Sequence, residues 1–461
     1  MTGPRTFDVA VIGAGLVGSA IARRFGATRL STVLIEARDD VGDGTSKANT
    51  AILHTGFDAK PGTLEARLVA RGYHLLGDYA AATGIPVERT GALLVAWDDE
   101  QLAALPGLRD KARRNGYAEC SIVDSRQVYH QVPDLAPGAL GGLTVPGESI
   151  TCTWTTNLAL ATEAVRRGVT LLRGHRVTAV RDDGTRTWLS TAHGDIGARW
   201  VVNAAGLGSD AVDRLFGHER FTVTPRRGEL LVFDKLARPK APRIVLPVPS
   251  KVGKGVLISP TIYGNVMLGP TAEDLGDRAA TGTSEAGFAF LREKGAALMP
   301  SLLDEEVTAA YAGLRAAIDA DDYLIDVDES RRYVLAGGIR STGLTACLAI
   351  AEHVASLVDG VLDLAERPGL PPPPRMPNLG EAGPRPYQDA AAIAADPEYG
   401  RIVCFCERVT RGEIRDAFAS PIPPSTVDGL RRRTRAMNGR CQGFYCGAEV
   451  AALAESGGRP R

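Results

Sequence analysis

The chain has 461 residues, of which 44% are hydrophobic and 23% are charged. Two or three packed units are expected, because this length exceeds what one hydrophobic core usually organises. The 53 basic side chains nearly balance the 54 acidic ones, so no overall charge favours nucleic acid or anionic lipid as a partner. No apolar stretch approaches membrane-spanning length, and the N-terminus is typical of a strand rather than a signal peptide. We therefore expect a cytoplasmic protein without a transmembrane segment, associated with a membrane only through a partner.

Strand and helix signals alternate at the start of the chain. Residues 7–13 (FDVAVIG) are a β-branched run that breaks on glycine, residues 16–27 have helical spacing of apolar side chains, and residues 31–37 return to a strand pattern. This order predicts a βαβ unit and a parallel sheet, and therefore an α/β fold.

The bend after the first strand has the spacing G-x-G-x-x-G at Gly13, Gly15 and Gly18, and Glu36 ends the next strand. Gly13 permits a tight turn, Gly15 lets a pyrophosphate approach the helix N-terminus, and Gly18 allows close packing of helix and strand. The carboxylate of Glu36 can accept hydrogen bonds from ribose hydroxyls and would repel the 2′-phosphate of NADP. These residues predict a dinucleotide site.

Two later segments favour FAD over NAD. Residues 201–210 (VVNAAGLGSD) put small residues, including Gly206, where a strand passes close to a long cofactor. Residues 336–347 (AGGIRSTGLTAC) give a second glycine-rich turn, with Gly338 and Gly343, that leads into a helix. A helix N-terminus directed at the flavin would stabilise the negative charge of the reduced ring.

Together with the glycine bend, the segments GTSKANTAILHTGFDAKPGTLEARL, VVNAAGLGSD, KGVLISPTIYGNVMLGPTAED and GIRSTGLTACLAIAEHVA resemble the D-amino-acid-oxidase superfamily of flavoproteins. Within it they are similar to the branch of 2-hydroxyglutarate and glycerol-3-phosphate dehydrogenases, over residues 5–365. The resemblance implies a Rossmann-type FAD-binding domain with an inserted α+β substrate domain. We assign residues 1–80, 150–215 and 326–366 to the FAD-binding domain and residues 81–149 and 216–325 to the substrate domain.

The resemblance also implies roles for single residues. Thr45, Ser46 and Asn49 match a loop that runs along the isoalloxazine, and Val177 matches a backbone position beside the adenine or its ribose. His54, in the context HTG, matches a histidine at the flavin. Neutral imidazole suits this role, because removing hydride from an alcohol requires a base for the hydroxyl proton near pH 7.

Cationic residues are the candidates for holding an anionic substrate. Arg315 matches a position at which relatives place an arginine toward the substrate, and a planar guanidinium can clamp a carboxylate or phosphate. Lys254, Arg227 and Tyr263 are weaker candidates for a substrate role. Arg340, in the segment GIRSTG, is a candidate for facing the flavin or the substrate.

The substrate stays open between two anionic alcohols. The segment GIRSTGL departs from the G-K-L-T-T-Y-R of anaerobic glycerol-3-phosphate dehydrogenases, whereas the segment around His54 looks more like the 2-hydroxyglutarate branch. An amine or imino-acid dehydrogenase and an electron-transfer subunit of a larger complex are the alternatives to an alcohol dehydrogenase.

A proline-rich segment separates the C-terminal end from the rest. Eight of the nineteen residues 368–386 are proline, so we expect an extended linker over residues 367–399. Residues 400–461 follow as a small module, which has too few residues for a stable core without a metal centre.

Four of the seven cysteines lie in this module. Cys404 and Cys406 form a C-x-C pair, and Cys441 and Cys446 form a C-x4-C pair after 34 intervening residues. Four thiolates can hold a 2Fe–2S cluster or a zinc ion, and a module without metal is a third possibility. The one-residue gap is unusual for zinc. The segments VCFCERVTRGEI and NGRCQGFYCGAEV resemble the bacterioferritin-associated-ferredoxin-like module, which implies a 2Fe–2S cluster.

These features together predict an FAD-dependent dehydrogenase that passes electrons through a 2Fe–2S centre. The expected partners are a small anionic substrate and an electron-acceptor protein or quinone-linked subunit, with no nucleic acid. A cluster that only stabilises the module is the alternative to a relay.

Overall fold

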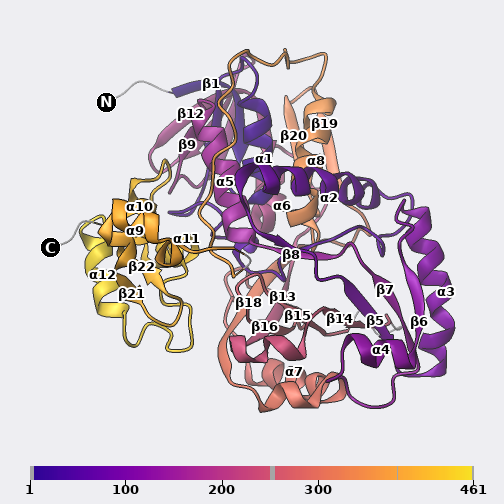
Figure 1. Ribbon diagram of the computed structural model, residues 1–461. Helices are drawn as coiled ribbons and strands as arrows, with labels where there is room; N and C mark the ends of the chain where they lie inside the picture. The colour runs from indigo at the N-terminus through magenta and orange to yellow at the C-terminus, as the bar shows by residue number, and fades with distance from the viewer. Residues whose placement is uncertain (1–4, 250–254, 382, 459–461) are drawn as a thin grey trace.

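The computed structural model describes residues 5–249, 255–381 and 383–458 and is shown in Figure 1. Lys254, one of the predicted substrate-binding residues, lies outside these ranges. Two large β-sheets with their helices form the body of the molecule. A small C-terminal module lies beside the body.

The first large sheet has eight strands. They are β1 (Arg5–Ile12), β2 (Thr32–Ile35), β9 (Thr170–Leu172), β10 (Ala179–Asp182), β11 (Thr187–Thr191), β12 (Gly194–Asn203), β19 (Leu324–Asp328) and β20 (Tyr333–Gly337). The strands β9, β2, β1, β12 and β20 run parallel to one another in that spatial order. This parallel sheet contains the βαβ unit predicted from the first residues of the chain.

The sequence of β1 explains why this strand lies in the centre of the sheet. Val9 and Val11 belong to the hydrophobic core that includes helices α1 (Leu16–Phe25) and α8 (Gly343–Leu357). Ala10 and Ile12 belong to a second core on the opposite face. Successive side chains of a strand point to opposite faces, so an uninterrupted apolar run fits a strand that is buried on both.

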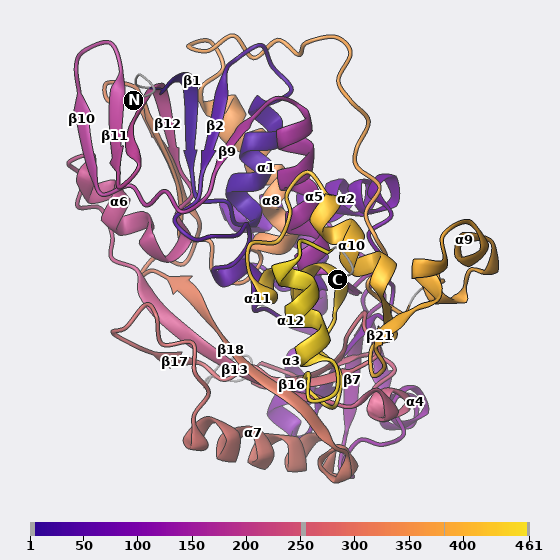
Figure 2. The ribbon, with the colours of Figure 1, turned by 90° about the vertical axis from the view of Figure 1, so that its left-hand side faces the viewer.

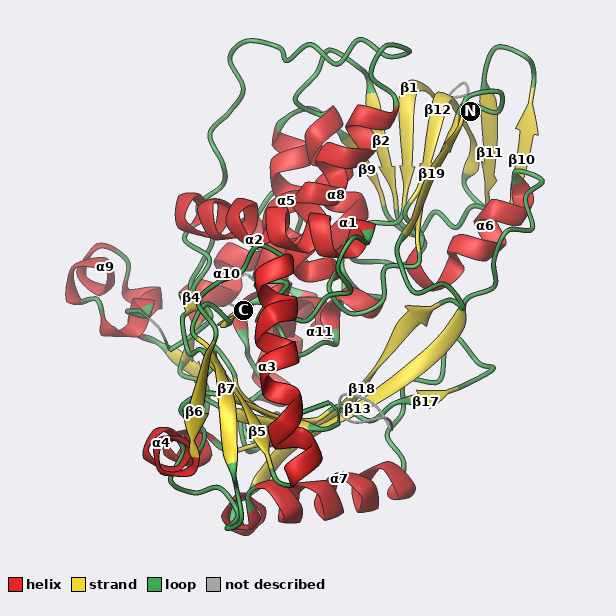
Figure 3. Ribbon diagram, turned by 90° about the vertical axis from the view of Figure 1, so that its right-hand side faces the viewer, coloured by secondary structure: helices red, strands yellow, loops and turns green. Residues whose placement is uncertain are grey.

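Helices cover both faces of this sheet (Figure 3). Helices α1 and α8 pack against each other on one face, together with α2 (Leu64–Thr83) and α5 (Thr153–Arg166). Helix α6 (Ser209–Leu215) contacts β12 and β20 and contributes to the core of the other face.

The second large sheet has nine strands and is mostly antiparallel. Its strands are β5 (Ala92–Ala96), β6 (Ser121–Asp124), β7 (Gly141–Val145), β13 (Thr224–Phe233), β14 (Ile244–Pro247), β15 (Leu257–Pro260), β16 (Val266–Gly269), β17 (Glu273–Asp274) and β18 (Val307–Ala317). Helices α3 (Asp99–Arg114), α4 (Ser125–Gln131) and α7 (Glu285–Leu298) pack against it.

The remaining elements of the body are short. A three-stranded sheet consists of β3 (Ile52–Leu53), β8 (Ser149–Thr151) and β4 (Val87–Glu88). The 3-10 helices are η1 (Thr45–Lys47), η2 (Gly206–Gly208), η3 (Lys235–Lys240), η4 (Pro300–Asp304), η5 (Pro386–Gln388) and η6 (Pro397–Gly400). The predicted α/β class is confirmed by the parallel sheet with its helices. The domain boundaries given above stay a prediction.

The described residues of the proline-rich segment 368–385 contain no helix or strand, as their composition predicts. The segment nevertheless lies against the body. The backbone N–H of Met376 donates to the carbonyl of Thr83, and that of Glu381 donates to the carbonyl of Ile262. A short helix, α9 (Ala390–Ala395), follows before the module begins.

The C-terminal module combines a small β-hairpin with three helices. Its elements are β21 (Ile402–Cys404), β22 (Val409–Thr410), α10 (Arg411–Ala419), α11 (Val427–Thr434) and α12 (Gly447–Glu455). Figure 2 shows the module alongside the helices of the first sheet, and α11 contacts α5.

A buried ion pair joins the module to the loop after β2. The carboxylate of Asp40 accepts hydrogen bonds from Nη1 and Nη2 of Arg433, at 2.6 and 2.7 Å, and from Arg432 at 3.0 Å. Asp40 is 2% exposed. Burial would raise the pKa of this carboxyl, but the two guanidinium groups outweigh it and lower the pKa. Asp40 is therefore ionised and paired at neutral pH.

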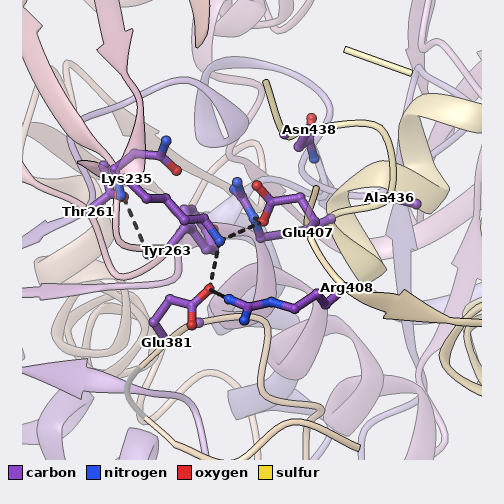
Figure 4. Close-up of polar contacts among 12 residues, drawn as sticks. Lys235, Thr261, Tyr263, Glu381, Glu407, Arg408, Ala436 and Asn438 are labelled. Carbon is purple, nitrogen blue, oxygen red and sulfur yellow. Dashed lines mark hydrogen bonds and ion pairs between the residues drawn. The ribbon is translucent and has the colours of Figure 1, made fainter. Parts of the chain in front are cut away.

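A second group of contacts joins the module to the second sheet (Figure 4). Nζ of Lys235 lies 3.3 Å from the carboxylate of Glu407 and 2.6 Å from that of Glu381. Glu407 also accepts a hydrogen bond from Nε of Arg435, at 2.8 Å, and Arg435 lies 4.0 Å over the ring of Tyr263. The module thus forms ion pairs with a loop of the first sheet, through Asp40, and with a segment next to the second sheet, through Lys235.

We predict that Asp40→Asn destabilises the docked module. Breaking a buried ion pair leaves the guanidinium of Arg433 uncompensated, which costs roughly 3–5 kcal/mol. Thermal unfolding and hydrogen exchange of α10, α11 and α12 should both show the loss. Asp39→Asn changes the charge of the neighbouring, exposed position and serves as the matched control. Equal stability of the two variants would contradict the prediction.

Candidate functional site

A cavity of about 780 Å³ lies at the carboxyl ends of β1, β2, β12 and β20. Its other wall comes from β13 and β18 of the second sheet, through residues such as Gly228 and Gly313. Ligands of open parallel sheets bind outside the carboxyl ends of the strands. The cavity therefore lies where the sequence predicts a dinucleotide.

The glycine bend after β1 leaves no room for side chains. Gly13 has a φ of +103°, and a Cβ there would lie 2.5 Å from the carbonyl oxygen of Ala204. A Cβ on Gly18 would lie 1.8 Å from the carbonyl oxygen of Gly13, so helix α1 packs closely on the bend. Gly15 lines the cavity, and a Cβ there would lie 2.9 Å from Oγ of Ser46.

Glu36 and Val177 both line the cavity. The carboxylate of Glu36 accepts hydrogen bonds from the backbone N–H groups of Ala14 and Arg38, both at 2.8 Å. Burial raises the pKa of Glu36, partly offset by these hydrogen bonds. The two predicted residues are thus brought together from positions 141 apart in the chain.

Thr45, Ser46 and Asn49 line the cavity from the loop between β2 and β3. Oγ1 of Thr45 donates to the carbonyl of Leu314 at 2.9 Å. Oγ of Ser46 accepts from the backbone N–H of Leu16 at 3.0 Å, at the start of α1. These hydrogen bonds fix the loop against both α1 and β18.

Gly206, Gly338 and Gly343 also line the cavity. Gly206 and Gly338 have φ values of +56° and +67°, which favour glycine. Gly343 begins α8, so the first N–H groups of this helix lie at the cavity wall. The positive end of the helix dipole favours negative charge at that point.

These features fit an extended FAD. Glycines line the cavity at the bend after β1, the acidic side chain of Glu36 lines it as well, and so does the N-terminal end of α8 at Gly343. Of the residues predicted to contact the cofactor, all but Gly18 line the cavity, and Gly18 permits the close approach of α1.

His54 lines the cavity directly after β3. Its backbone N–H donates to Oγ1 of Thr345 in the first turn of α8, at 3.0 Å. Nδ1 lies 2.9 Å from Oε2 of Glu148. The side chain is 26% exposed, so it is held on one side and accessible from the cavity.

Glu148 is a candidate functional residue that the sequence analysis missed. It lies in the turn between β7 and β8, 94 residues from His54, and is 2% exposed. No spacing rule connects the two positions. The only signal in the sequence is a lone acidic residue in the apolar segment GGLTVPGESIT.

Arg315 and Arg340 are two of the arginines that line the same cavity. Arg315 is on β18, and its Nη2 donates to the carbonyl of Thr271 at 2.6 Å. Burial, with Arg226 nearby, lowers the pKa of Arg315, although a guanidinium stays charged at neutral pH. Arg340 lies on the loop between β20 and α8, 3.3 Å from the carboxylate of Glu65.

The other two weak candidates lie away from the cavity wall. Arg227 pairs with Glu273 at 2.5 Å. Tyr263 stacks on Trp154, with a centroid distance of 5.3 Å, and lies beneath Arg435 of the module. Tyr263 therefore belongs to the contact between the body and the module.

The four predicted metal ligands form two pairs in the module. The side chains of Cys406 and Cys441 lie within hydrogen-bond distance of each other, as do those of Cys404 and Cys446. Backbone N–H groups of residues 443–445, most strongly that of Tyr445, together with the Cys406 thiol, outweigh burial and lower the pKa of Cys441. A thiolate is the ligating form of cysteine.

Two irons, each held by two thiolates, fit this arrangement. Across the described ranges, no three His, Cys, Asp or Glu side chains converge as a single metal ion requires. All seven cysteines are free thiols.

No helix among the described residues is both long enough and apolar enough to span a membrane.

Comparison with known proteins identifies both parts of the chain. Residues 8–357 match the family described as FAD dependent oxidoreductase, and residues 402–456 match the BFD-like 2Fe-2S binding domain. The predicted cofactors, FAD and a 2Fe–2S cluster, are therefore confirmed.

Several relatives are similar over most of the chain. The chain is 34% identical to the glycerol 3-phosphate dehydrogenase of Caloramator mitchellensis, over 97% of this chain and 93% of that protein. It is 26% identical to the mitochondrial L-2-hydroxyglutarate dehydrogenase of Arabidopsis thaliana, over 76% and 83% of the two chains. Its fold is similar to that of the dithionite-reduced L-alpha-glycerophosphate oxidase of Mycoplasma pneumoniae with FAD bound, at a TM-score of 0.76 and 26% identity, covering 81% and 99%.

These matches agree with the cavity at the strand ends and with the paired thiols. The chain therefore belongs to the FAD dependent oxidoreductase family and carries a BFD-like 2Fe-2S binding domain at its C-terminus.

Proposed function

We propose that the protein is an FAD-dependent dehydrogenase that oxidises glycerol 3-phosphate, with 2-hydroxyglutarate as the alternative substrate. The observation that carries this proposal is the pairing of His54 with the buried carboxylate of Glu148 in a cavity that also exposes Arg315 and Arg340. The Caloramator relative supports glycerol 3-phosphate, because it matches this chain over both the body and the module.

His54 is proposed to act as the base. Its imidazole would take the proton of the substrate hydroxyl as the C–H bond is broken. Bound FAD supplies the two-electron acceptor for the hydride from that carbon. The contacts of His54 with Thr345 and Glu148 hold the ring in place for this proton transfer.

Arg315 and Arg340 are proposed to hold the anionic group of the substrate, with Lys254 as a third candidate. A phosphate or carboxylate is bound most strongly by a guanidinium that makes two parallel hydrogen bonds. The start of α8, at Gly343, adds a favourable field for negative charge.

Cys404, Cys406, Cys441 and Cys446 are proposed as the ligands of the 2Fe–2S cluster. The cluster would pass electrons one at a time from the flavin to an electron-acceptor protein or a quinone-linked subunit. Phe405, Phe444 and Tyr445 flank these ligands and are 73–84% exposed, which supports access of a partner to this face.

Two further expectations belong to the proposal. The domain boundaries given above are proposed for the FAD-binding domain, the substrate domain, the linker and the module. A cytoplasmic location is proposed, since a reducing compartment keeps the seven cysteines as thiols.

His54→Gln should slow flavin reduction by glycerol 3-phosphate by about 100-fold or more, because loss of general base catalysis costs roughly 10²–10⁴-fold. Anaerobic stopped-flow absorbance of the flavin measures the rate. His130→Gln, at an exposed position on α4, is the matched control and should react like the wild type. An unchanged rate for His54→Gln would favour a pure electron-transfer subunit, and reduction by amino acids alone would favour an amine dehydrogenase.

Arg315→Lys should raise the KM for glycerol 3-phosphate about tenfold or more, since a hydrogen bond to a charged group contributes roughly 1.5–3 kcal/mol. Steady-state kinetics with an artificial electron acceptor measure the effect. Arg226→Lys is the control, because Arg226 lies opposite Arg315 on β13 and pairs with the exposed Asp274. Equal KM values for both variants would contradict a substrate role for Arg315.

Cys446→Ser should remove iron and acid-labile sulfide while leaving bound FAD and its reduction by substrate intact. The reason is that FAD and the cluster occupy separate parts of the chain. Metal analysis and the visible spectrum measure the loss, with Cys120→Ser as the control. Stoichiometric zinc in the wild-type protein would contradict the cluster assignment.

A further inference from the structure

We propose that Glu148 is a positioning residue that keeps His54 in the tautomer protonated on Nδ1, so that Nε2 accepts the substrate proton. This inference rests on the proposed function and names a residue that acts through His54. Four observations carry it: the strand register, the burial of Glu148, the donors around its carboxylate and, among the residues that the structure describes, the lack of a charged side chain besides His54 within bonding distance of it.

The register of two short strands brings the pair together. In the antiparallel pairing of β3 with β8, Ile52 lies opposite Ile150 and Leu53 lies opposite Ser149. The next position along each strand places His54 opposite Glu148. His54 directly follows β3 and Glu148 directly precedes β8, so the paired strands hold the two residues at neighbouring ends of the ladder.

The carboxylate of Glu148 is surrounded by donors. Oε1 accepts from the backbone N–H of Thr55 at 2.6 Å and from its hydroxyl at 2.9 Å. Oε2 lies 2.9 Å from Nδ1 of His54. An ionised carboxylate only accepts hydrogen bonds. A proton on Nδ1 is therefore required at this contact, and the lone pair of the neutral ring lies on Nε2.

The other ionisable groups near Glu148 do not supply a second charged partner for its carboxylate. Burial, together with Glu148 and Glu119, raises the pKa of Cys120 to about 12, so this thiol is neutral. Burial also raises the pKa of Tyr73 and that of Tyr117, whose hydroxyl accepts a hydrogen bond from the backbone N–H of Gly147. Arg89 and Glu119 act on these side chains from a distance. No charged side chain among the described residues other than His54 is within hydrogen-bond distance of the Glu148 carboxylate.

The proton balance of the proposed step is simple. The O–H bond of the substrate breaks, its proton bonds to Nε2, and its electron pair forms the C=O bond of the product, while the C–H electron pair leaves as hydride, for which bound FAD would be the acceptor. The imidazolium that results is stabilised by the negative charge of Glu148. His54 then returns the proton to solvent.

Glu148→Gln preserves the shape of the side chain and breaks this arrangement. The backbone N–H of Thr55 is a fixed donor, so the amide oxygen must face it. The amide NH₂ then faces Nδ1 of His54, which favours the tautomer protonated on Nε2. That tautomer has no lone pair directed at the substrate.

We expect Glu148→Gln to lower the rate of flavin reduction by about 100-fold or more. The acidic limb of the pH profile should also move to lower pH, because the imidazolium loses a neighbouring negative charge. Glu148→Asp keeps the charge and should recover part of the rate. Glu119→Gln removes an exposed carboxylate nearby and should leave both rate and profile unchanged.

A second measurement needs neither turnover nor a variant of Glu148. Nitrogen NMR of the wild-type holoprotein labelled with ¹⁵N-histidine reports the tautomer of each ring, and comparison with His54→Gln assigns the signals of His54. We expect a protonated Nδ1 and an unprotonated Nε2 at pH 8. A protonated Nε2 overturns the inference, as does a Glu148→Gln variant that keeps the wild-type rate and profile.

The two measurements separate this inference from the proposed function. If neither glycerol 3-phosphate nor 2-hydroxyglutarate reduces the flavin, the proposed function fails. The NMR result still decides whether Glu148 sets the tautomer of His54.

Discussion

The parallel strands β1, β2, β12 and β20 of the first sheet have their carboxyl ends on the same side, and the whole candidate site depends on this arrangement. The ends of β1, β2, β12 and β20 deliver the glycine bend, Glu36, Gly206 and the turn into α8 to one cavity. Parallel strands connected through helices necessarily place successive loops at the same side of the sheet. The cofactor site is thus a consequence of topology, and the second sheet supplies the opposite wall.

His54 and the C-terminal module both contact segments that line this cavity or adjoin it. His54 is anchored to the first turn of α8 through Thr345, so the proposed base moves with the helix that faces the flavin. The loop that carries Thr45 and Ser46 is held on its other side by the ion pair of Asp40 with Arg433. The ion pair of Asp40 with Arg433 therefore links the cluster module to the loop that lines the flavin cavity. The FAD-binding part of the chain and the cluster module are therefore in direct contact.

The part of the site that is local in sequence could be predicted, and the part that depends on long-range pairing could not. The roles of Gly13, Gly15 and Gly18 follow from spacing and from the flanking strand and helix. Thr45, Ser46, Asn49 and His54 came only from resemblance, because a lone polar residue in a loop has no distinctive local signal. The four cysteine ligands could be predicted because metal-binding cysteines occur in short motifs such as C-x-C and C-x4-C.

Contacts between distant residues explain what the sequence analysis left out. Glu148 reaches His54 across 94 positions through strand register, and Asp40 reaches Arg433 across 393 positions through docking of the module. Helices α2 and α3, with 20 and 16 residues, were not assigned, although each begins with a side-chain cap at Thr63 or Asp98. The proline-rich segment was read correctly as irregular, but its hydrogen bonds to Thr83 and Ile262 depend on a surface that composition does not reveal.

We propose that substrate electrons enter at the flavin and leave through the cluster of the same chain. Anaerobic addition of glycerol 3-phosphate to the intact protein, followed by optical and electron paramagnetic resonance spectra, tests it most directly. We expect bleaching of the flavin band followed by the signal of a reduced 2Fe–2S cluster. A bleached flavin beside a cluster that stays oxidised would contradict the relay, and an unbleached flavin would contradict the substrate.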